Sequence, residues 1–247
     1  MLEDICYTKN PIKEAIIRLD FLIPIPQFND EIPSELISII KKLFPIPEPR
    51  EVIARELQIS NKGVTQNENK VKEWNFHNKE RNRKLVITKD SLLLVHNDYE
   101  SYVKFSSDFF TIVNPFFKIF NLQLQRFGMR YVNNIEIEKG DPFNWTQLLN
   151  KNLLCIFNIP ENKQIIARAF HNLELNFGEF NVRFQYGMHN PDYPAPIKKK
   201  AFILDYDAYT SGILGKDELD SYFPEFHIAI QKLFESSITE RFRTIYK

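Results

Sequence analysis

Apolar and polar residues alternate along residues 12–23, and this pattern predicts a first β-strand. The apolar positions are Ala15, Ile17, Leu19 and Phe21, and the polar positions between them are Glu14, Arg18 and Asp20. A strand with one apolar and one polar face is typical of an antiparallel sheet that packs on one side and meets water on the other. The same two-residue period predicts further strands at residues 52–60, 71–77, 124–138 and 201–209.

Two stretches of the chain have the pattern of a β-hairpin. Residues 83–97 hold two apolar runs on either side of the polar turn Thr88–Ser91. Residues 165–177 and 180–188 alternate in the same way on either side of Gly178. Residues 61–70 are almost all polar, and we expect them to form a loop.

Apolar residues at helical spacing predict four helices. These span residues 32–44, 104–121, 143–150 and 217–246. In the second helix, Ser106 or Ser107 is expected to cap the start and Asp108 to lie in the first turn. Apolar residues cover nearly the whole circumference of that helix, so we expect it to be central and buried.

The order of the expected elements is doubled along the chain. Residues 1–121 and residues 122–247 each read as a strand, a short helix, several antiparallel strands and a long helix. A short echo accompanies this order, because "LFPIPEP" in the first half matches "IFNIPEN" in the second. We predict an α+β fold with a largely antiparallel curved sheet and two long helices on one face. The two halves are interpreted as pseudo-repeats within one compact unit.

Composition and charge make some classes of protein less favoured, although local basic patches remain possible. The 247 residues contain 32 Lys and Arg and 32 Asp and Glu, whereas a generic nucleic-acid coat or polybasic membrane binder is more basic. Cys6 and Cys155 have no metal-type or redox-type partner at short spacing, which indicates reduced thiols in a cytoplasmic protein. The sequence has no run of about 18 apolar residues, so we expect no membrane span.

Two arginines share the polar face of the strand predicted at residues 124–138. Arg126 and Arg130 flank Gly128, whose missing side chain leaves a gap that a phosphate, a carboxylate or a partner side chain can enter. The alternative is that both arginines pair with carboxylates of neighbouring strands. Candidates for that pairing are Glu14, Asp20, Asp205 and Asp207. We interpret the Asn133–Asn134 pair as a bulge in the same strand, with ligand binding by Asn133 as the alternative.

Asp205 and Asp207 share one face of the last strand and are candidates for a cation site or for acid–base chemistry. The more conservative expectation is that they form ion pairs with Arg168 or Arg183. None of the five histidines has a second ligand at metal-site spacing, and His227 reads as a core histidine. We therefore expect no metal and no cofactor.

Two basic segments flank predicted strands and are candidates for binding. Their basic residues are Lys79, Arg81 and Arg83 in the first segment and Lys198, Lys199 and Lys200 in the second. If they lie beside the two arginines of the central strand, they form a phosphate-binding stripe. No ribonucleoprotein motif, zinc finger or glycine-rich phosphate loop accompanies them.

Three motifs together resemble a known family. They are "NPIKEAIIRLDF" near the start, "LQRFGMRYVNNIEI" in the middle, and "FILDYDAY" followed by a terminal "LFESSITERFR". The chain resembles, over nearly its whole length, a sporadically distributed prokaryotic family of proteins of about this size and of unknown function. Scattered occurrence of that kind is often associated with defence systems or mobile elements. The resemblance implies no catalytic residues.

The sequence therefore favours a non-catalytic accessory or sensor protein that binds a partner or ligand, in a defence-type system. A protein partner or a homo-oligomer is the expected association. One alternative is a nucleic-acid-binding protein that uses the basic loops and the arginine-bearing face. The other is an enzyme with a carboxylate site at Asp205 and Asp207.

Overall fold

The computed structural model describes residues 5–60 and 63–247, with the backbone alone for residues 54–60 and 63–69. The strands are β1 (Ile12–Phe21), β2 (Ile46–Pro47), β3 (Arg50–Ser60), β4 (Gly63–His77), β5 (Arg83–Ile87), β6 (Ser91–His96), β7 (Leu124–Ile137), β8 (Ala169–Asn176), β9 (Asn181–Met188) and β10 (Lys200–Leu214). The helices are α1 (Ser34–Leu43), α2 (Tyr102–Phe120), α3 (Lys216–Ser237) and α4 (Glu240–Tyr246), with 3-10 helices η1 (Pro26–Asn29), η2 (Lys151–Asn158) and η3 (Lys163–Ile165).

The ten strands of the described chain form one open antiparallel sheet, so the α+β class predicted from the sequence is confirmed. The order is β2-β4-β5-β6-β1-β7-β10-β9-β8, and β3 pairs with β4. Outward from the centre, the first half runs β1-β6-β5-β4 and the second half runs β7-β10-β9-β8. Both halves thus share one strand order, as the predicted duplication requires, and they join where β1 pairs with β7.

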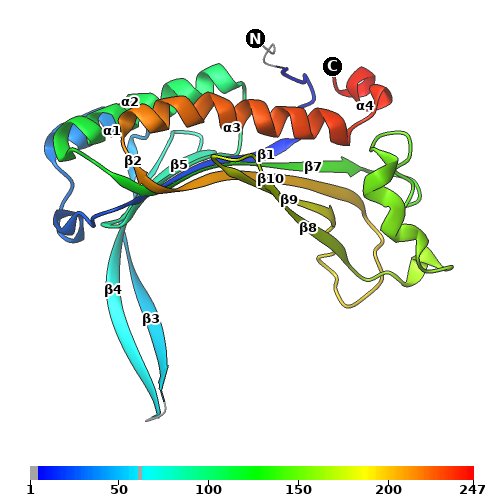
Figure 1. Cartoon of the computed structure of the whole chain (residues 1–247), viewed down its shortest axis with the longest axis horizontal. Coiled ribbons are helices and arrows are strands. Elements are labelled where there is room, and N and C mark those ends of the chain that lie inside the picture. The colour runs from blue at the N-terminus through cyan, green and yellow to red at the C-terminus, as the bar shows by residue number, and fades with distance from the viewer. Residues whose placement is uncertain (1–4, 61–62) are drawn as a thin grey trace.

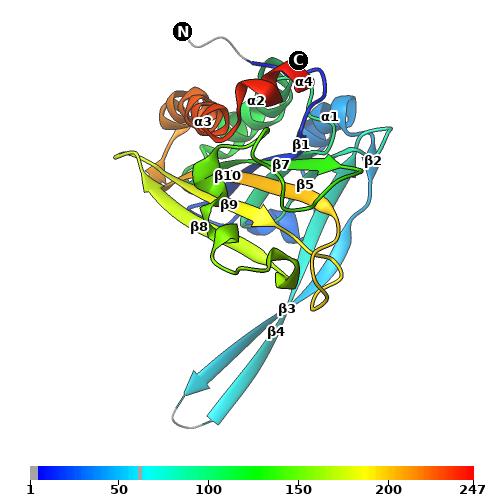
Figure 2. The same cartoon turned by 90° about the vertical axis from the view of Figure 1, so that its right-hand side faces the viewer.

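The helices cover one face of the sheet and leave the other open. Helices α1, α2 and α3 lie side by side above the sheet in both views (Figures 1 and 2). The sheet curves away from them, so its uncovered face is concave (Figure 1). We call this face the underside. No helix of the described chain is long and apolar enough to cross a membrane.

Aromatic side chains join the two halves into one core. Phe127 of β7 stacks on Phe226 of α3 at 4.8 Å between ring centroids, and Phe109 of α2 stacks on Phe223 of α3 at 5.0 Å. All four side chains are fully buried. Because this cluster links both long helices to the central strand pair, neither half has a separate core.

Strands β3 and β4 form a long hairpin that projects away from the sheet on the side of the underside (Figure 1). The loop predicted at residues 61–70 is therefore wrong from Gly63 onward, because β4 begins there; residues 61 and 62 lie outside the described residues. The sequence of this part is polar because a hairpin that leaves the sheet has no core to face. The alternation that reveals a half-buried strand is then missing.

Two of the predicted helices differ from the structure, and one contact between the two segments explains both differences. Residues 143–150 form turns instead of a helix, and the predicted terminal helix is interrupted between α3 and α4. Leu149 and Ile238 form an antiparallel bridge, and Asn150 N donates to Ser237 O at 2.9 Å. These backbone groups are used in a long-range pairing, so neither segment can continue as a helix. Thr239 then caps α4 by accepting from Phe242 N.

Helix α2 begins earlier than predicted. Its cap is Ser101, whose hydroxyl accepts from Lys104 N at 3.2 Å. Asp108 lies in the second turn of the helix and is buried, with Arg83 and Lys104 as its ion-pair partners. A buried aspartate paired in this way is stable away from the helix start, and that misled the sequence prediction.

The bulge predicted at Asn133–Asn134 is wrong. Strand β7 pairs with β10 in unbroken register through both residues. The irregularity lies instead in β1, where the pairing with β7 shifts between Ile12 and Glu14. From Arg126 to Ile137, β7 keeps one register with β10, so Ile135 is buried on the same face as Phe127.

Candidate functional site

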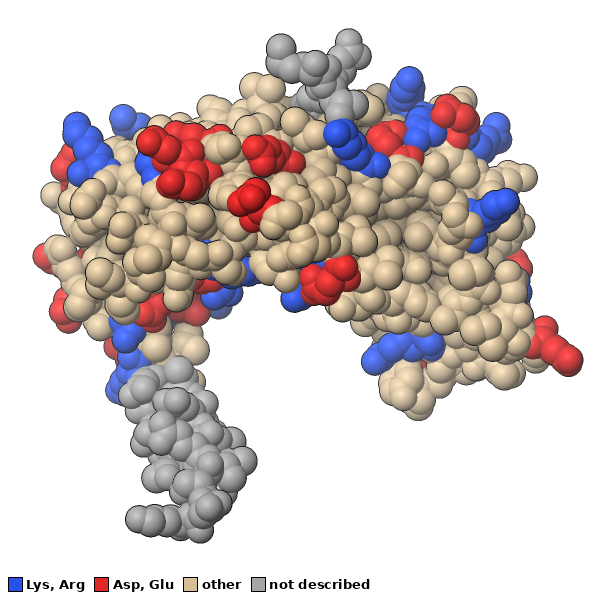
Figure 3. Space-filling model, in the orientation of Figure 1, with Lys and Arg blue, Asp and Glu red and all other residues tan. Residues whose placement is uncertain are grey.

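Charged side chains are concentrated in the middle of the underside. The pairing of β1, β7, β10, β9 and β8 fixes which residues lie next to one another. We define the central charge cluster as Arg18, Asp20, Arg126, Arg130, Glu174, Arg183, Asp205, Asp207 and Tyr209. Figure 3 shows that the underside is hollowed and that side chains of both signs line it.

One row of the cluster alternates in charge across four strands. Arg130 of β7 lies opposite Asp207 of β10, which lies opposite Arg183 of β9, which lies opposite Glu174 of β8. Neighbouring positions in such a row are about 5 Å apart. Each charge therefore lies next to opposite charges, which offsets part of the cost of burying them.

Arg130 is held firmly by Asp205. Its Nε donates to Asp205 Oδ1 at 2.8 Å and its Nη2 to Oδ2 at 2.6 Å, which is the two-pronged geometry that suits a guanidinium and a carboxylate. Asp205 is 5% exposed. The hydrogen bonds to this carboxylate raise the pKa of Arg130. The pair fixes β7 against β10 and engages both carboxylate oxygens of Asp205.

Arg126 is held much more loosely. Its Nη atoms lie 3.6 Å from Asp207 Oδ2 and 3.9 Å from Asp20 Oδ2, and it donates no hydrogen bond to any described residue. Its side chain is 29% exposed, and its guanidinium lies 5.2 Å from the centre of the Tyr209 ring. A Cβ placed on Gly128 would lie 3.5 Å from Arg126 Nη2. The gap predicted at Gly128 is thus covered by the Arg126 guanidinium itself, whose donors remain unused.

Asp207 is the carboxyl group nearest to Arg126. Burial raises its pKa, and the guanidiniums of Arg126, Arg130 and Arg183 counteract this only in part. It accepts no hydrogen bond from a described side chain, and its closest ion-pair contact is the 3.6 Å one to Arg126. Arg126 and Asp207 therefore form the part of the cluster in which hydrogen-bonding capacity is left over.

The predicted pairing of the two central arginines with carboxylates of neighbouring strands is confirmed, because Arg130 pairs with Asp205 and Arg126 lies near Asp207 and Asp20. The other predicted pairing, of Asp205 or Asp207 with Arg168 or Arg183, is wrong. Arg183 lies beside Asp207 but donates to Glu174 Oε1 at 2.6 Å, and Arg168 stacks on Tyr193 at 4.2 Å. Asp205 pairs with Arg130 instead.

The basic segments do not join the cluster. Arg83 points to the helix-covered side, where Asp98, Glu100 and Asp108 surround it, and Arg81 pairs with Glu48 at 2.6 Å. Lys79 is exposed on the turn between β4 and β5.

The second basic segment lies far along the strands. Lys200 is paired with Ile137, seven residues along β7 from Arg130, which is roughly 23 Å at the usual rise per residue. Its ammonium group lies 5.4 Å from the centre of the Trp145 ring, and Lys198 and Lys199 are exposed. The predicted phosphate-binding stripe is therefore not formed.

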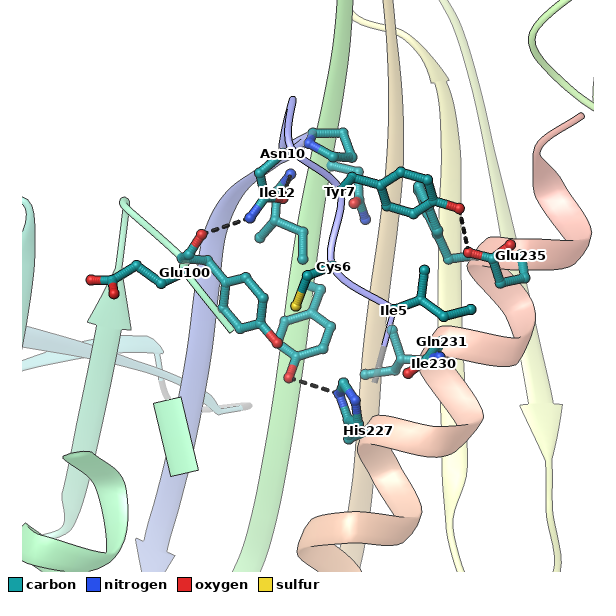
Figure 4. A pocket seen from close by; sticks show the side chains of 15 residues that line it. Ile5, Cys6, Tyr7, Asn10, Ile12, Glu100, His227, Ile230, Gln231 and Glu235 are labelled. Carbon is teal, nitrogen blue, oxygen red and sulfur yellow. Dashed lines mark hydrogen bonds between the residues drawn. The ribbon is translucent and has the colours of Figure 1, made fainter. Parts of the chain in front are cut away.

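Asn133 also lies away from the underside. It is 3% exposed on the helix-covered face, where its amide donates to Leu204 O at 3.0 Å. It lines a cavity of about 50 Å³ between the segment that precedes β1, the end of β7 and α3 (Figure 4). This volume, left by the described residues, is too small for an organic ligand.

The cavity is bordered by polar side chains that bond to one another. The Tyr7 hydroxyl donates to Glu235 at 2.6 Å, and His227 Nδ1 lies 3.2 Å from the Tyr131 hydroxyl (Figure 4). His227 also stacks on Tyr102 at 4.0 Å and is 8% exposed. His227 is thus a buried, hydrogen-bonded core histidine, as predicted.

The cluster contains residues that the sequence did not single out. Tyr209 lies on the same face of β10 as Asp205 and Asp207, and Arg18 lies on the polar face of β1 with Asp20. The two-residue period of each strand was therefore a usable signal for both residues. Glu174 could not be assigned in this way, because its place in the cluster depends on which strands are neighbours. Arg183 was named from the sequence only as a possible partner of Asp205 or Asp207, and it lies opposite Asp207.

The described residues contain no group of three or more side chains placed to hold a metal ion. Cys6 and Cys155 are both exposed and are not joined by a disulfide. No protein-family model matches the chain, and no curated protein matches it with significance.

Proposed function

We propose that this chain is a non-catalytic accessory or sensor protein that binds a protein partner on the underside of its sheet. The observation that carries the proposal is Arg126, which lies on the central strand β7 of an uncovered sheet face and has unused donors. That face is concave (Figure 1). A guanidinium in that state suits a carboxylate or a backbone carbonyl of a partner. The defence-type setting is a further part of the proposal and is supported by the family resemblance alone.

The charge of the underside favours a protein over a nucleic acid. The centre of the face carries four arginines, Arg18, Arg126, Arg130 and Arg183, against five carboxylates, Glu14, Asp20, Glu174, Asp205 and Asp207. Nucleic-acid sites instead present a surplus of positive charge to the phosphates. The basic segments that could supply such a surplus lie elsewhere.

Apolar side chains next to the cluster also suit a protein interface. Ile16 of β1 is paired with Val95 of β6, and Leu93 of β6 lies opposite Arg18. These three apolar residues are partly exposed on the underside. A mixture of arginine, tyrosine and partly exposed apolar residues is the composition of the centre of many protein interfaces.

The proposal is tested by capturing partners with tagged protein from cells that naturally express it. Wild type, Arg126→Ala and Arg81→Ala are compared; Arg81 is an exposed arginine outside the cluster and serves as the matched control. A protein that is recovered with wild type and Arg81→Ala but lost with Arg126→Ala supports the proposal. The proposal is contradicted if nucleic acid is recovered in place of protein. It is also contradicted if the same protein is recovered equally with wild type, Arg126→Ala and Arg81→Ala.

A further inference from the structure

The outer edge of β8 is an open strand edge. Within the part of the chain that the structure describes, β8 forms backbone hydrogen bonds with β9 alone. Phe170 is 42% exposed and Leu173 is 44% exposed, and Phe177, just after the strand, is 46% exposed. Unpaired N–H and C=O groups beside exposed apolar side chains form a ready template for another strand.

The opposite edge of the sheet is protected where it borders the covered core. There β4 is flanked by β2, which has two residues and contains Pro47, while β3 flanks the part of β4 that projects away from the sheet. Short edge strands and proline are the usual devices that prevent edge-to-edge pairing. Strand β8 has eight residues and no proline, so its edge lacks the protection that β2 gives to the other side of the sheet.

Strand β8 is also close to electrically neutral. Its one carboxylate, Glu174, is balanced by Arg183 at 2.6 Å and accepts a hydrogen bond from the Tyr209 hydroxyl at 3.3 Å. His171 stacks on Tyr186 at 4.9 Å. No surplus charge of one sign on this edge repels an identical edge.

We propose that β8 pairs with β8 of a second copy of this chain, antiparallel about a two-fold axis through Leu173. In that register Leu173 lies opposite its own counterpart, and Asn172 lies opposite Glu174 on the other face of the strand. The amide of Asn172 donates to the carboxylate of Glu174 twice, once on each side of the axis. Phe177 then covers Ala169 of the second copy, and the two sheets become continuous.

A two-fold axis through the neighbouring residue Asn172 is less favourable. An axis through Asn172 places Phe170 opposite Glu174, so that an apolar ring covers a carboxylate and neither group gains a partner. Leu173 would then lie opposite His171. The axis through Leu173 therefore pairs leucine with leucine and the Asn172 amide with the Glu174 carboxylate, and it places Phe170 opposite Asn176 instead of opposite a charged group.

The pairing is tested by measuring the mass of the full chain in solution at tens of micromolar, by light scattering or sedimentation. Wild type is expected to dimerise. Leu173→Lys places two ammonium groups directly opposite each other and is expected to weaken the dimer at least about tenfold. Val103→Lys is the matched control, because Val103 is an apolar residue on α2 that is 68% exposed; it should leave the dimer intact. A monomeric wild type, or a dimer insensitive to Leu173→Lys, overturns the proposal.

A charge-swap mixture identifies the axis. Leu173→Lys and Leu173→Glu should each be monomeric alone and should form a heterodimer when mixed, because opposite charges then face each other across the axis. Recovery of the dimer in the mixture supports the pairing centred on Leu173. A mixture that stays monomeric overturns it. Unchanged circular dichroism of each variant shows that the fold is retained, as the exposure of Leu173 predicts.

Discussion

Arg130→Ala is expected to destabilise the fold, because it leaves the buried carboxylate of Asp205 without its partner. Asp205 is 5% exposed, and both of its oxygens accept hydrogen bonds from Arg130. Breaking a fully buried ion pair costs about 3–5 kcal/mol, whereas an exposed pair contributes less than about 1 kcal/mol.

The expected loss lies between these limits. The Arg130 side chain is 41% exposed, so water can enter the space that the guanidinium leaves and partly solvate Asp205. We therefore expect Arg130→Ala to lower the free energy of unfolding by about 2 kcal/mol. For a chain of this size that corresponds to a fall in Tm of about 4–8 °C.

Thermal and urea unfolding, followed by circular dichroism, measure this loss. Arg183→Ala is the matched control, because Arg183 lies in the same row and pairs with Glu174 where both side chains are more than 40% exposed. It is expected to cost less than about 1 kcal/mol. Adding Asp205→Asn to Arg130→Ala removes the lone buried charge and should restore part of the stability. Equal losses for the two arginines, or no recovery in the double variant, would refute the reasoning.

Three further predictions concern stability. Burial raises the pKa of Asp207, so its charged form is disfavoured in the folded protein. Asp207→Asn should therefore raise Tm at pH 7, and calorimetry should show that this gain in Tm shrinks as the pH falls to about 4. Burial lowers the pKa of His96 to about 4, so the free energy of unfolding of the wild type should fall by about 3 kcal/mol as the pH falls from about 6.5 to 4. Urea titrations of His96→Gln across that pH range should lack this contribution to the fall in stability. Gly187 and Gly212 have similar φ angles, +147° and +145°, but a Cβ on Gly187 would lie 2.1 Å from Ala169 O, whereas a Cβ on Gly212 would meet nothing within 4 Å. Gly187→Ala should therefore lower Tm far more than Gly212→Ala in thermal unfolding.

Local patterns were sufficient to predict most of the fold. Alternation along β1, β7 and β10 assigned both their strand character and the face that each residue occupies. The doubled element order pointed to the shared strand order of the two halves. The predictions failed where the decisive contact is distant in sequence, as at Leu149 and Ile238, or where a segment faces no core, as in the β3–β4 hairpin.

The candidate site was predictable in part. The placement of Arg126 and Arg130 on the uncovered face is confirmed, because a two-residue period fixes it once Phe127 is in the core. The carboxylates that pair with them were among the predicted candidates. Which carboxylate each arginine takes was not predictable, because Asp205 and Asp207 each lie between two arginine-bearing strands and only the side-chain geometry decides the pairing. The basic segments were candidates because they flank strands in the sequence. Their position along the sequence does not determine which end or face of the sheet they reach.

The most direct test of the proposed function is photo-crosslinking from the underside in cells that express the protein. A photoreactive residue replaces Arg18, which belongs to the central charge cluster and has a side chain that is 54% exposed. The control replaces Val103 on the helix-covered side. A cross-link to a protein from position 18, lost on adding Arg126→Ala and absent from position 103, is the predicted result. Cross-linking from position 103 alone, or no cross-link from either position, would contradict binding on the underside.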